Sequence, residues 1–556
     1  MKKGLFLVSL IIITAMFSGC NIDLGGLLEQ NRDEDYSFLD GSIDDVLDTG
    51  PVKGGTLNLF STIPDTLNPI FTANAFIKDY SCFVYEGLIK LDEKQRPIPV
   101  LAKNWEVSDT GLIWTFHLRS DVYWHDNIPF TAEDVEFTAG VIAGAGLDSS
   151  YFTIFENIAR FTALDSQTFE IELHTPNSFT PGLMTFPIIP KHYYMGENIE
   201  ISPKNNTPIG TGPYKFVEYR EDEYIRLQSN RDWWNSNKKG EGEPDLPHIE
   251  EINIKVYTKG SSYINAFQAG EIDIIEADKN NWYSYSGRTD VILKKYVSNR
   301  FEFVAFNLSN KILEDKEVRR AISLAIDRNK IINDIMPGGA VMADLPIIPD
   351  TFMYDTNTIS YEKDIEESKN ILSESGWKER GGLLYKRING INTSLTLELL
   401  VNTDNGFRLE MAEEIKRQLE EIGVILNISA VGWEQVLDKI KTHKFDMVLT
   451  GCTVTSIPDI SFLYSSSEIG IGINIAGYSE QVVDNYLERI LKENDPAMKK
   501  AYFINMKETI TGDIPYIGLF FYYDAIVYSK RVRGKFGPSA WNKYEDFTRW
   551  YIPDIG

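Results

Sequence analysis

The chain has 556 residues, enough for about three to four domains or fewer large lobes, and its 43% hydrophobic residues can fill a large core. A formal net charge of -26 argues against nucleic-acid binding, because phosphate contacts need clustered Lys and Arg. The three cysteines, Cys20, Cys82 and Cys452, form no CxxC pair, so neither a disulfide framework nor a zinc ribbon is indicated.

The first twenty residues indicate export. Lys2 and Lys3 precede an apolar run, Leu5 to Phe17, that is too short for a comfortable transmembrane helix, and small residues precede Cys20. This order resembles the bacterial lipoprotein signal, which implies that residues 1–19 are cleaved and that the Cys20 thiol is lipidated. The resemblance implies an extracytoplasmic protein that is bound to the cell membrane through the Cys20 lipid. A plain signal peptide or a membrane anchor is the alternative.

Residues 20–53 are predicted to be an acidic, flexible tether. Between Asn21 and Lys53 the segment has nine Asp and Glu residues against only Arg32 and Lys53. Such a segment buries too little apolar surface to order itself, and its charges repel one another. We expect it to hold the folded part away from the membrane.

The folded part begins at Gly54-Gly55 with a predicted strand, Thr56–Phe60. A helix is predicted from Ala75 to Gly87, with Gly87 as its C-cap. Both elements precede the most specific run of the chain, residues 101–137.

Residues 101–137 are predicted to form a hairpin followed by a helix. Trp114, Phe116 and Leu118 alternate with polar residues, as expected of a half-buried strand. Thr131 is predicted to cap the helix, with Asp134 three residues later as its capping-box partner.

At this point the chain resembles the family 5 extracellular solute-binding proteins, the peptide- and nickel-binding receptors of ABC importers. The motifs that carry the resemblance extend over the whole mature chain. They are Trp105, Phe116-His117-Leu118-Arg119, Trp124-His125, Thr131-Ala132-Glu133-Asp134-Val135, Gly210-Thr211-Gly212-Pro213-Tyr214, Leu227 to Trp234, Ala269-Gly270-Glu271-Ile272-Asp273, Asn307 to Arg328, Gly376-Trp377, Ile422-Gly423-Val424 and Asp513-Ile514-Pro515. We interpret them as marks of a fold. The tryptophans are expected in the core, and Arg319, Arg320 and Asp327 at the surface or in structural ion pairs.

The resemblance implies an α/β, two-lobe periplasmic-binding-protein-like fold (type II, class C) with an extra subdomain in the first lobe. The first lobe would comprise residues 54–95, 205–300 and 520–556, with the extra subdomain at 96–204. The second lobe would comprise residues 301–519. Ligand would bind between the lobes and stabilise the closed form.

One stretch of the second lobe, Phe445 to Leu463, changes character abruptly. A short apolar strand, Phe445–Leu449, is followed by small and polar residues up to Ser456, which predict a loop. Loops of this kind at the carboxyl edge of an open α/β sheet are places where ligands bind. An ordinary connection between two elements is the alternative interpretation.

In peptide-binding relatives, an extended ligand pairs with the backbone of one strand from each lobe, as in β-augmentation. Gapless alignment to the family places the first contact strand on Ala73-Asn74-Ala75 and the second on Gly451-Cys452-Thr453. Trp433 matches a tryptophan that lines a side-chain pocket in relatives, with core packing as the alternative.

The sequence departs from the family where a carboxylate is expected to bind the ligand's terminal ammonium. Thr455 occupies that position, and Cys452 replaces a neighbouring tryptophan. A buried ammonium without a counter-charge is costly, so Thr455 cannot serve alone. Asp459 could supply the charge if the loop is shifted. Otherwise the ligand lacks a free amine at that point, as an oligosaccharide does, or it lies in another register.

No catalytic constellation stands out: there is no HExxH, P-loop, GxSxG or GxGxxG motif. None of the six histidines lies four residues from another, so helical metal pairing is unsupported. His117 and His125 are interpreted as structural. We therefore expect no enzyme activity, no cofactor and no resident metal.

The expected function is that of a lipid-anchored receptor of an ABC transporter. It would capture extracellular oligopeptides by lobe closure and deliver them, as a monomer, to a membrane permease and its ATPase subunits. The first alternative keeps this role but changes the ligand to an oligosaccharide or a chelated metal such as nickel. The second is a secreted hydrolase with two essential carboxylates.

Overall fold

The computed structural model describes residues 50–237, 247–258, 262–277, 282–354 and 361–553. These residues form two compact units, each with its own hydrophobic core. We call Val297–Tyr523 lobe II, and the described residues of Gly41–Tyr296 and Asp524–Gly556 lobe I. The chain enters and leaves lobe II inside two long strands, β12 (Val291–Phe306) and β20 (Tyr516–Ser529). The predicted signal peptide, Cys20 and nearly all of the predicted tether lie outside the described residues.

Lobe I contains a four-stranded sheet in the order β1-β10-β9-β8. Its strands are β1 (Thr56–Ser61), β10 (Glu251–Val256), β9 (Tyr224–Ser229) and β8 (Tyr214–Arg220). Strand β1 begins at the predicted residue. Helix α1 (Ala75–Val84) ends earlier than predicted, because Tyr85 is already extended, and the assignment of Gly87 as the C-cap was wrong. Gly87 instead allows close backbone contact, since a Cβ there would lie 2.8 Å from the carbonyl oxygen of Thr185.

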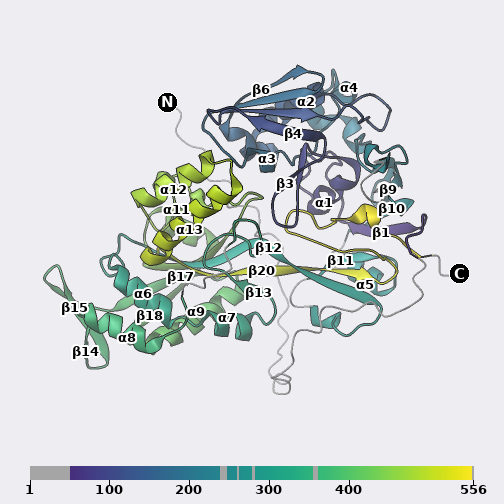
Figure 1. The fold of residues 1–556 in the computed structure, drawn as a ribbon. Helices are drawn as coiled ribbons and strands as arrows, with labels where there is room; N and C mark the ends of the chain where they lie inside the picture. The colour runs from purple at the N-terminus through teal and green to yellow at the C-terminus, as the bar shows by residue number, and fades with distance from the viewer. Residues whose placement is uncertain (1–49, 238–246, 259–261, 278–281, 355–360, 554–556) are drawn as a thin grey trace. The chain divides into compact units, whose positions relative to one another are not determined.

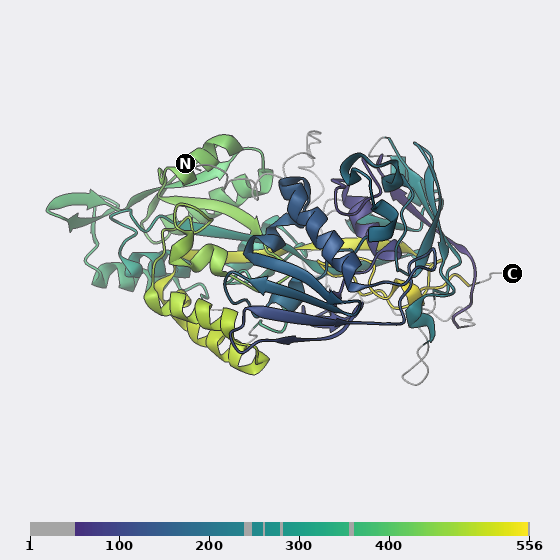
Figure 2. The same ribbon diagram turned by 90° about the horizontal axis from the view of Figure 1, so that it is seen from above.

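A second sheet of lobe I has the order β4-β5-β7-β6 and coincides with the hairpin region of the sequence. Its strands are β4 (Ala102–Val107), β5 (Ile113–Leu118), β7 (Thr168–Leu173) and β6 (Ile158–Asp165). Alternate residues of β5 are buried, as predicted. Helix α2 (Ala132–Ala145) packs against β6 and β7 (Figure 2). The predicted capping box is present, with the Thr131 N–H donating to the Asp134 carboxylate over 2.9 Å.

In lobe II the strands follow the order β20-β12-β19-β17-β18. Strand β19 (Met447–Thr453) is antiparallel to β12 and parallel to β17 (Thr396–Asn402), which is parallel to β18 (Ile425–Val431). Strand β13 (Ala340–Met342) pairs with the lobe II part of β20, and β11 (Ile274–Ala277) with its lobe I part. The second half of β17, Leu399–Asn402, is buried without interruption, as expected of a strand covered on both faces.

Helices α7, α8 and α9 lie on one side of the lobe II strands, and α12 and α13 on the other (Figure 1). Most lobe II helices begin at an Asp or Asn side chain that accepts a backbone N–H, which explains where they start. The capped helices, with their caps, are α6 (Lys316–Ala325, Asp315), α7 (Arg328–Ile335, Asp327), α8 (Ile365–Glu374, Asp364), α9 (Gly406–Glu420, Asn405) and α13 (Pro496–Asp513, Asp495). Helices α10 (Trp433–Lys441) and α12 (Gln481–Lys492) have no such cap.

Shorter elements complete the fold. They are β2 (Ile89–Leu91), β3 (Pro97–Pro99), α3 (Thr180–Leu183), α4 (Lys191–Tyr194), α5 (Ser262–Gln268), α11 (Ser461–Tyr464) and the three strands β14 (Lys378–Arg380), β15 (Leu383–Ile388) and β16 (Ile391–Ser394). Within the ranges that the structure describes, no helix combines the length and apolarity required to cross a bilayer.

Candidate functional site

The carboxyl ends of three parallel strands meet at one edge of the lobe II sheet. Strand β17 ends at Asn402, β18 at Val431 and β19 at Thr453. The Thr403 N–H donates to the Val431 carbonyl over 2.9 Å and so joins the first two ends. Such an edge is where open α/β sheets bind ligands.

Strand β19 runs further than its residue types suggest. The sequence predicted a strand from Phe445 to Leu449 and then a loop, but the strand extends from Met447 through Thr453. The polar residues stay in the strand because each pairs with β12: Gly451 with Glu302, Cys452 with Phe301 and Thr453 with Arg300. The loop assignment of these residues was therefore wrong. Their placement in a strand agrees with the family alignment.

The last three residues of β19 have an open edge on the side away from β12. Strand β17 pairs only with Met447 and Val448, and no β-bridge joins Gly451, Cys452 or Thr453 to another strand among the described residues. The Val454 N–H donates to the Asn299 carbonyl on β12 over 2.8 Å. Because hydrogen bonding alternates along an antiparallel pair, Gly451 and Thr453 direct their N–H and C=O groups to the open edge.

A buried ion pair lies directly against Gly451. The Arg408 guanidinium on α9 binds the Glu302 carboxylate through two contacts, 2.5 Å from Nε and 3.1 Å from Nη2. A Cβ on Gly451 would lie 2.6 Å from Glu302 Oε2 and 3.0 Å from Arg408 Nη2. Only glycine fits at this position of the strand.

Two further side chains complete the hydrogen bonding of this ion pair. Arg408 Nη1 donates to Asn402 Oδ1 over 3.0 Å, and the Tyr522 hydroxyl lies 3.2 Å from Glu302 Oε2. Burial disfavours the guanidinium charge, but the Glu302 carboxylate more than offsets it and raises the pKa of Arg408. Sequence reasoning missed this cluster. Its one visible signal was a lone glutamate inside the apolar run of β12.

The Cys452 thiol is unreactive in this environment. Burial, reinforced by the nearby Glu302 charge, raises the pKa of its thiol to about 12. A thiol that stays protonated at neutral pH is a poor nucleophile.

Trp433 opens helix α10, two residues after the end of β18. Its N–H donates to Asp404 Oδ2 over 3.1 Å, which ties the loops after β17 and β18 together. The side chain is half-buried and is not among the residues of the lobe II core. Its position at the sheet edge fits a contact residue better than the core alternative.

Beyond β19, the two candidate residues for binding an ammonium group present different groups, a hydroxyl at Thr455 and a carboxylate at Asp459. The Thr455 hydroxyl donates to the Ile457 carbonyl over 3.0 Å. Asp459 Oδ1 accepts the Ser461 N–H over 2.9 Å. A second carboxylate, Glu468, lies close enough that its pKa is raised, first by burial and then by the Asp459 charge. Two carboxylates beyond β19 therefore act on each other, and sequence reasoning had named only Asp459.

The lobe I candidates do not form the strand that was predicted. Ala73 and Asn74 precede α1, Ala75 is its first residue, and Asn74 caps it by accepting the N–H groups of Phe76 and Ile77. The assignment of Ala73-Asn74-Ala75 to a strand was wrong, because the cap fixes the segment as a helix start. The backbone at Asn74 is nevertheless extended (φ -71°, ψ 116°), and Ala73 is exposed. Contact of these residues with a ligand stays a prediction.

Comparison with known proteins decides the family. The family model for bacterial extracellular solute-binding proteins, family 5 Middle, matches residues 96–471. The chain belongs to this family.

Similar proteins cover nearly the whole chain. The oligopeptide-binding protein AppA of Bacillus subtilis is 24% identical over 514 residues, which is 90% of this chain and 92% of AppA. The structure of the ABC transporter substrate-binding protein CtaP from Listeria monocytogenes is 25% identical, with a TM-score of 0.72 over 90% of this chain and 99% of CtaP. The AppA structure, in complex with a nonapeptide, has a TM-score of 0.62 at 23% identity and covers 91% of this chain and 100% of AppA. The predicted two-lobe α/β fold is thereby confirmed.

His125, in the Trp124-His125 motif of this family 5 protein, is structural, as expected. His125 Nε2 lies 3.0 Å from the Gly212 carbonyl, and Nδ1 accepts the Gly210 N–H over 3.2 Å. Burial lowers the pKa of His125 to about 4. Within the described residues no group of three or more His, Cys, Asp or Glu side chains could hold a metal ion.

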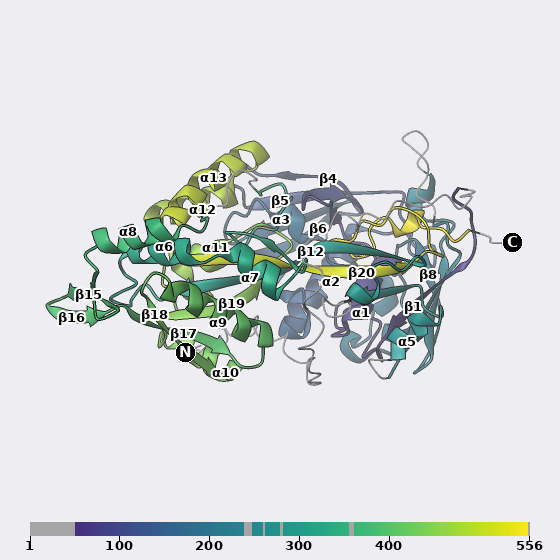
Figure 3. The ribbon, with the colours of Figure 1, turned by 90° about the horizontal axis from the view of Figure 1, so that it is seen from below.

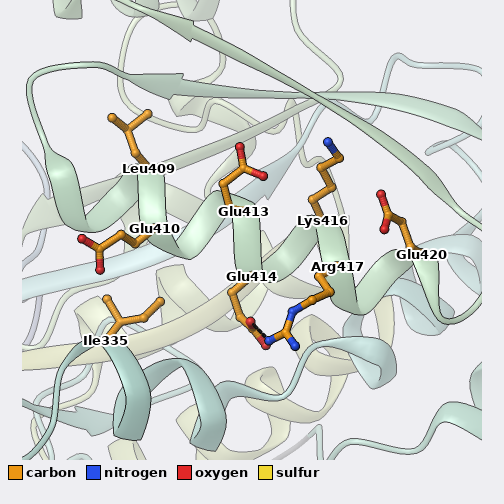
Figure 4. A pocket seen from close by; sticks show the side chains of 8 residues that line it. All are labelled: Ile335, Leu409, Glu410, Glu413, Glu414, Lys416, Arg417 and Glu420. Atoms are coloured by element: carbon orange, nitrogen blue, oxygen red, sulfur yellow. Dashed lines mark hydrogen bonds and ion pairs between the residues drawn. The ribbon is translucent and has the colours of Figure 1, made fainter. Parts of the chain in front are cut away.

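One hollow of the family 5 chain lies away from this sheet edge, on the outer face of α9. Its volume is about 670 Å³, and Figure 4 shows it lined by Ile335, Leu409, Glu410, Glu413, Glu414, Lys416, Arg417 and Glu420. Six of these eight side chains are charged, and Glu414 and Arg417 pair with each other. The lining is that of a solvated helix face, and it contains none of the predicted site residues.

Proposed function

We propose that this protein is the substrate-binding component of an ABC importer and captures extracellular oligopeptides. The observation that carries the proposal is the open edge of β19 at Gly451–Thr453. A peptide that lies antiparallel or parallel to this edge can exchange backbone hydrogen bonds with Gly451 and Thr453. The names of AppA and of the nonapeptide complex support the choice of ligand class.

Backbone pairing explains how one receptor tolerates many sequences. The groups on the open edge are amides and carbonyls, which every peptide residue matches regardless of its side chain. Gly451 adds no side chain to the edge, and the ion pair behind it keeps the strand in place. Trp433 at the same edge supplies apolar surface for a ligand side chain.

The ligand's amino end would be held by Asp459 together with Glu468. Burial and, after it, the Asp459 charge raise the pKa of Glu468. An ammonium group placed between the two carboxylates would relieve their repulsion and supply the counter-charge that Thr455 cannot. This arrangement replaces the single carboxylate that is expected of peptide-binding relatives.

The finer steps of transport belong to the same proposal. The lipid on Cys20 would hold the protein at the extracytoplasmic face of the membrane. Ligand would favour the closed arrangement of the lobes, and the loaded protein would pass its peptide to a permease driven by ATPase subunits. The family relationship supports a binding role without turnover.

A thermal-shift measurement tests the ligand class, because a ligand that binds only the folded state raises the melting temperature. Random pools of peptides about five residues long should raise it, whereas cello- and xylo-oligosaccharides should not. The same pools with acetylated amino ends should give a smaller shift, and Asp459→Asn should reduce the difference between free and acetylated pools. A shift with sugars and none with peptides would overturn the proposal in favour of the oligosaccharide alternative.

A further inference from the structure

A small three-stranded sheet extends from lobe II beyond α8, in the order β14-β15-β16 (Figures 1 and 3). Two-residue turns join its strands: Gly381-Gly382, and Asn389-Gly390. All four turn residues have positive φ, between 49° and 84°. This is the signature of tight type I′ hairpin turns, which fix the register of the three strands.

The register assigns the cations of this sheet to one face. Lys378 is opposite Tyr385, and Arg380 is opposite Leu383. Residues two apart on a strand point to the same side, so Arg387 joins Tyr385 and Leu383 on this face. Lys378, Arg380 and Arg387 are all exposed. We call this surface the basic hairpin face.

The opposite face of the sheet is anchored to lobe II. Leu384 and Ile388 pack against the lobe II core, and Lys386 Nζ binds Asp315 Oδ2 over 2.9 Å. Glu379 lies on this anchored side. The basic hairpin face therefore points away from the body of the lobe.

The three cations of the basic hairpin face have no carboxylate partner among the described residues. Lys378 and Arg380 make no side-chain hydrogen bond or ion pair there, and Arg387 Nε donates only to the Gly390 carbonyl over 3.0 Å. The chain as a whole nevertheless has a net charge of -26, and several other cations of lobe II lie beside a carboxylate, as Lys330 does beside Asp334. Three cations without a carboxylate partner on one sheet face form a local positive patch on an acidic protein.

We propose that the basic hairpin face docks on the phosphate headgroups of an anionic membrane surface. Tyr385 and Leu383 lie between the cations on this face. Basic side chains that flank an aromatic and aliphatic centre suit the interface between headgroups and acyl chains.

The negative charge of the rest of the chain does not prevent this contact. At physiological salt, charges are screened beyond about 8 Å, so the surface senses only the part of the protein that touches it. The hairpin sheet projects from its lobe and is the part that would make the contact (Figure 3). Each basic residue near an anionic leaflet strengthens binding roughly fivefold, so three together give on the order of 100-fold.

Vesicle flotation of the full chain tests the proposal. Vesicles of phosphatidylcholine alone would be compared with vesicles that also contain phosphatidylglycerol. Replacing Lys378, Arg380 and Arg387 by Gln should weaken binding to the anionic vesicles about 100-fold and leave binding to neutral vesicles unchanged. The control replaces Lys416, Lys441 and Lys444 by Gln, which changes the net charge equally elsewhere in lobe II and should have little effect.

Three further measurements make the result decisive. The charge-conserving variant with Arg380→Lys and Arg387→Lys should bind as the parent chain does, and about 1 M salt should abolish the preference for anionic vesicles. If the hairpin and control variants lose the same affinity for anionic vesicles, net charge alone explains the binding and the proposal is overturned. Binding of poly-L-glutamate as tight as that of anionic vesicles would also overturn it, because the face would then recognise acidic polypeptide.

Discussion

Gly451 and Glu302 face each other across the β19–β12 pair, and the glycine leaves room for the glutamate's carboxylate. The distance from an ideal Cβ at Gly451 to Glu302 Oε2 is 2.6 Å, and to the Phe301 carbonyl 2.7 Å. The carboxylate cannot move away, because Arg408 and Tyr522 both bind it. The open edge proposed for ligand backbone thus depends on the absence of one side chain.

Gly451→Ala is expected to destabilise the protein by about 1–3 kcal/mol, the usual cost of overpacking a buried site. It should also reduce the peptide-induced rise in melting temperature, since the strand must shift to accept the methyl group. Urea unfolding measures the first effect and the thermal shift the second.

Gly432→Ala is the matched control for this prediction. Gly432 ends the same sheet edge as N-cap of α10, and nothing lies within 4 Å of a Cβ placed there. Its replacement should change stability by less than about 0.5 kcal/mol, as surface substitutions usually do. Equal effects of the two alanines would contradict the role given to the Glu302–Arg408 pair.

The effect of the Asp459 charge on Glu468 predicts how a mutation at Asp459 changes the pKa of Glu468. The Asp459 charge contributes to raising the pKa of Glu468, so Asp459→Asn should lower that pKa toward its ordinary value. Burial is the larger cause, so part of the upward shift should persist. A nuclear magnetic resonance titration of the Glu468 carboxyl would measure the change.

Asp438→Asn, at an exposed position of α10, serves as the control for this titration. It should leave the pKa of Glu468 unchanged, because Asp438 is not among the charges that act on Glu468. If Asp459→Asn also leaves it unchanged, the two carboxylates do not interact and the proposed ammonium site loses its basis.

Local patterns predicted the parts of the fold that depend on neighbours in sequence. The alternation of Trp114, Phe116 and Leu118 predicted the buried face of β5, and Thr131 with Asp134 predicted the start of α2. These signals are local because periodicity and capping involve residues within one turn or one strand. The family motifs supplied the two-lobe architecture, which no local pattern contains.

The features that depend on distant residues could not be predicted. Glu302 and Arg408 are 106 positions apart, and nothing in either segment shows that they meet. The polar residues of β19 stay in a strand only because β12 pairs with them, so their composition misled the loop prediction. Likewise Gly87 was predicted to be a helix C-cap. A glycine is needed there because the Thr185 backbone packs against it and leaves no space for a Cβ.

Arg319 and Arg320 are adjacent in sequence, but Arg319 is buried and Arg320 is exposed. The buried Arg319 guanidinium donates to the carbonyls of Leu313, Glu314, Asp513 and Ile514. Arg319→Met should cost about 3–5 kcal/mol of unfolding free energy, because it leaves several buried carbonyls without a donor. Chemical denaturation would measure the loss.

Arg320→Met provides the comparison on the same helix. Arg320 is 51% exposed and lies 3.7 Å from Glu317 and 3.5 Å from Glu367. Exposed ion pairs contribute about 0–1 kcal/mol, so its loss should be small. A cost at Arg320 equal to that at Arg319 would refute the assignment of Arg319 as the structural group.

Glu86 in lobe I predicts how stability depends on pH. Its carboxylate accepts hydrogen bonds from the indoles of Trp233 and Trp234, at 3.3 and 2.9 Å, and from the Thr211 hydroxyl at 2.9 Å. These bonds and the nearby Arg119 favour the charged form, but burial outweighs them and raises the pKa of Glu86 to about 7. A raised carboxyl pKa means that the folded state holds the proton more tightly than the unfolded state. The resulting stabilisation is complete below the unfolded pKa of about 4.3 and is lost as the pH rises to about 7.

Glu86→Gln removes this titration, so its unfolding free energy should depend less on pH than that of the parent chain. The difference between the two should change between pH 5 and pH 7 with a slope of at most about 1.4 kcal/mol per pH unit, the limit for one proton. Urea unfolding at pH 5, 6, 7 and 8 measures it, with Glu93→Gln as an exposed control. The amide cannot accept all three hydrogen bonds, so a constant offset between variant and parent is expected at every pH. A difference that is the same at pH 5 and pH 8 would show that Glu86 does not titrate in this range, because the offset alone carries no pH dependence.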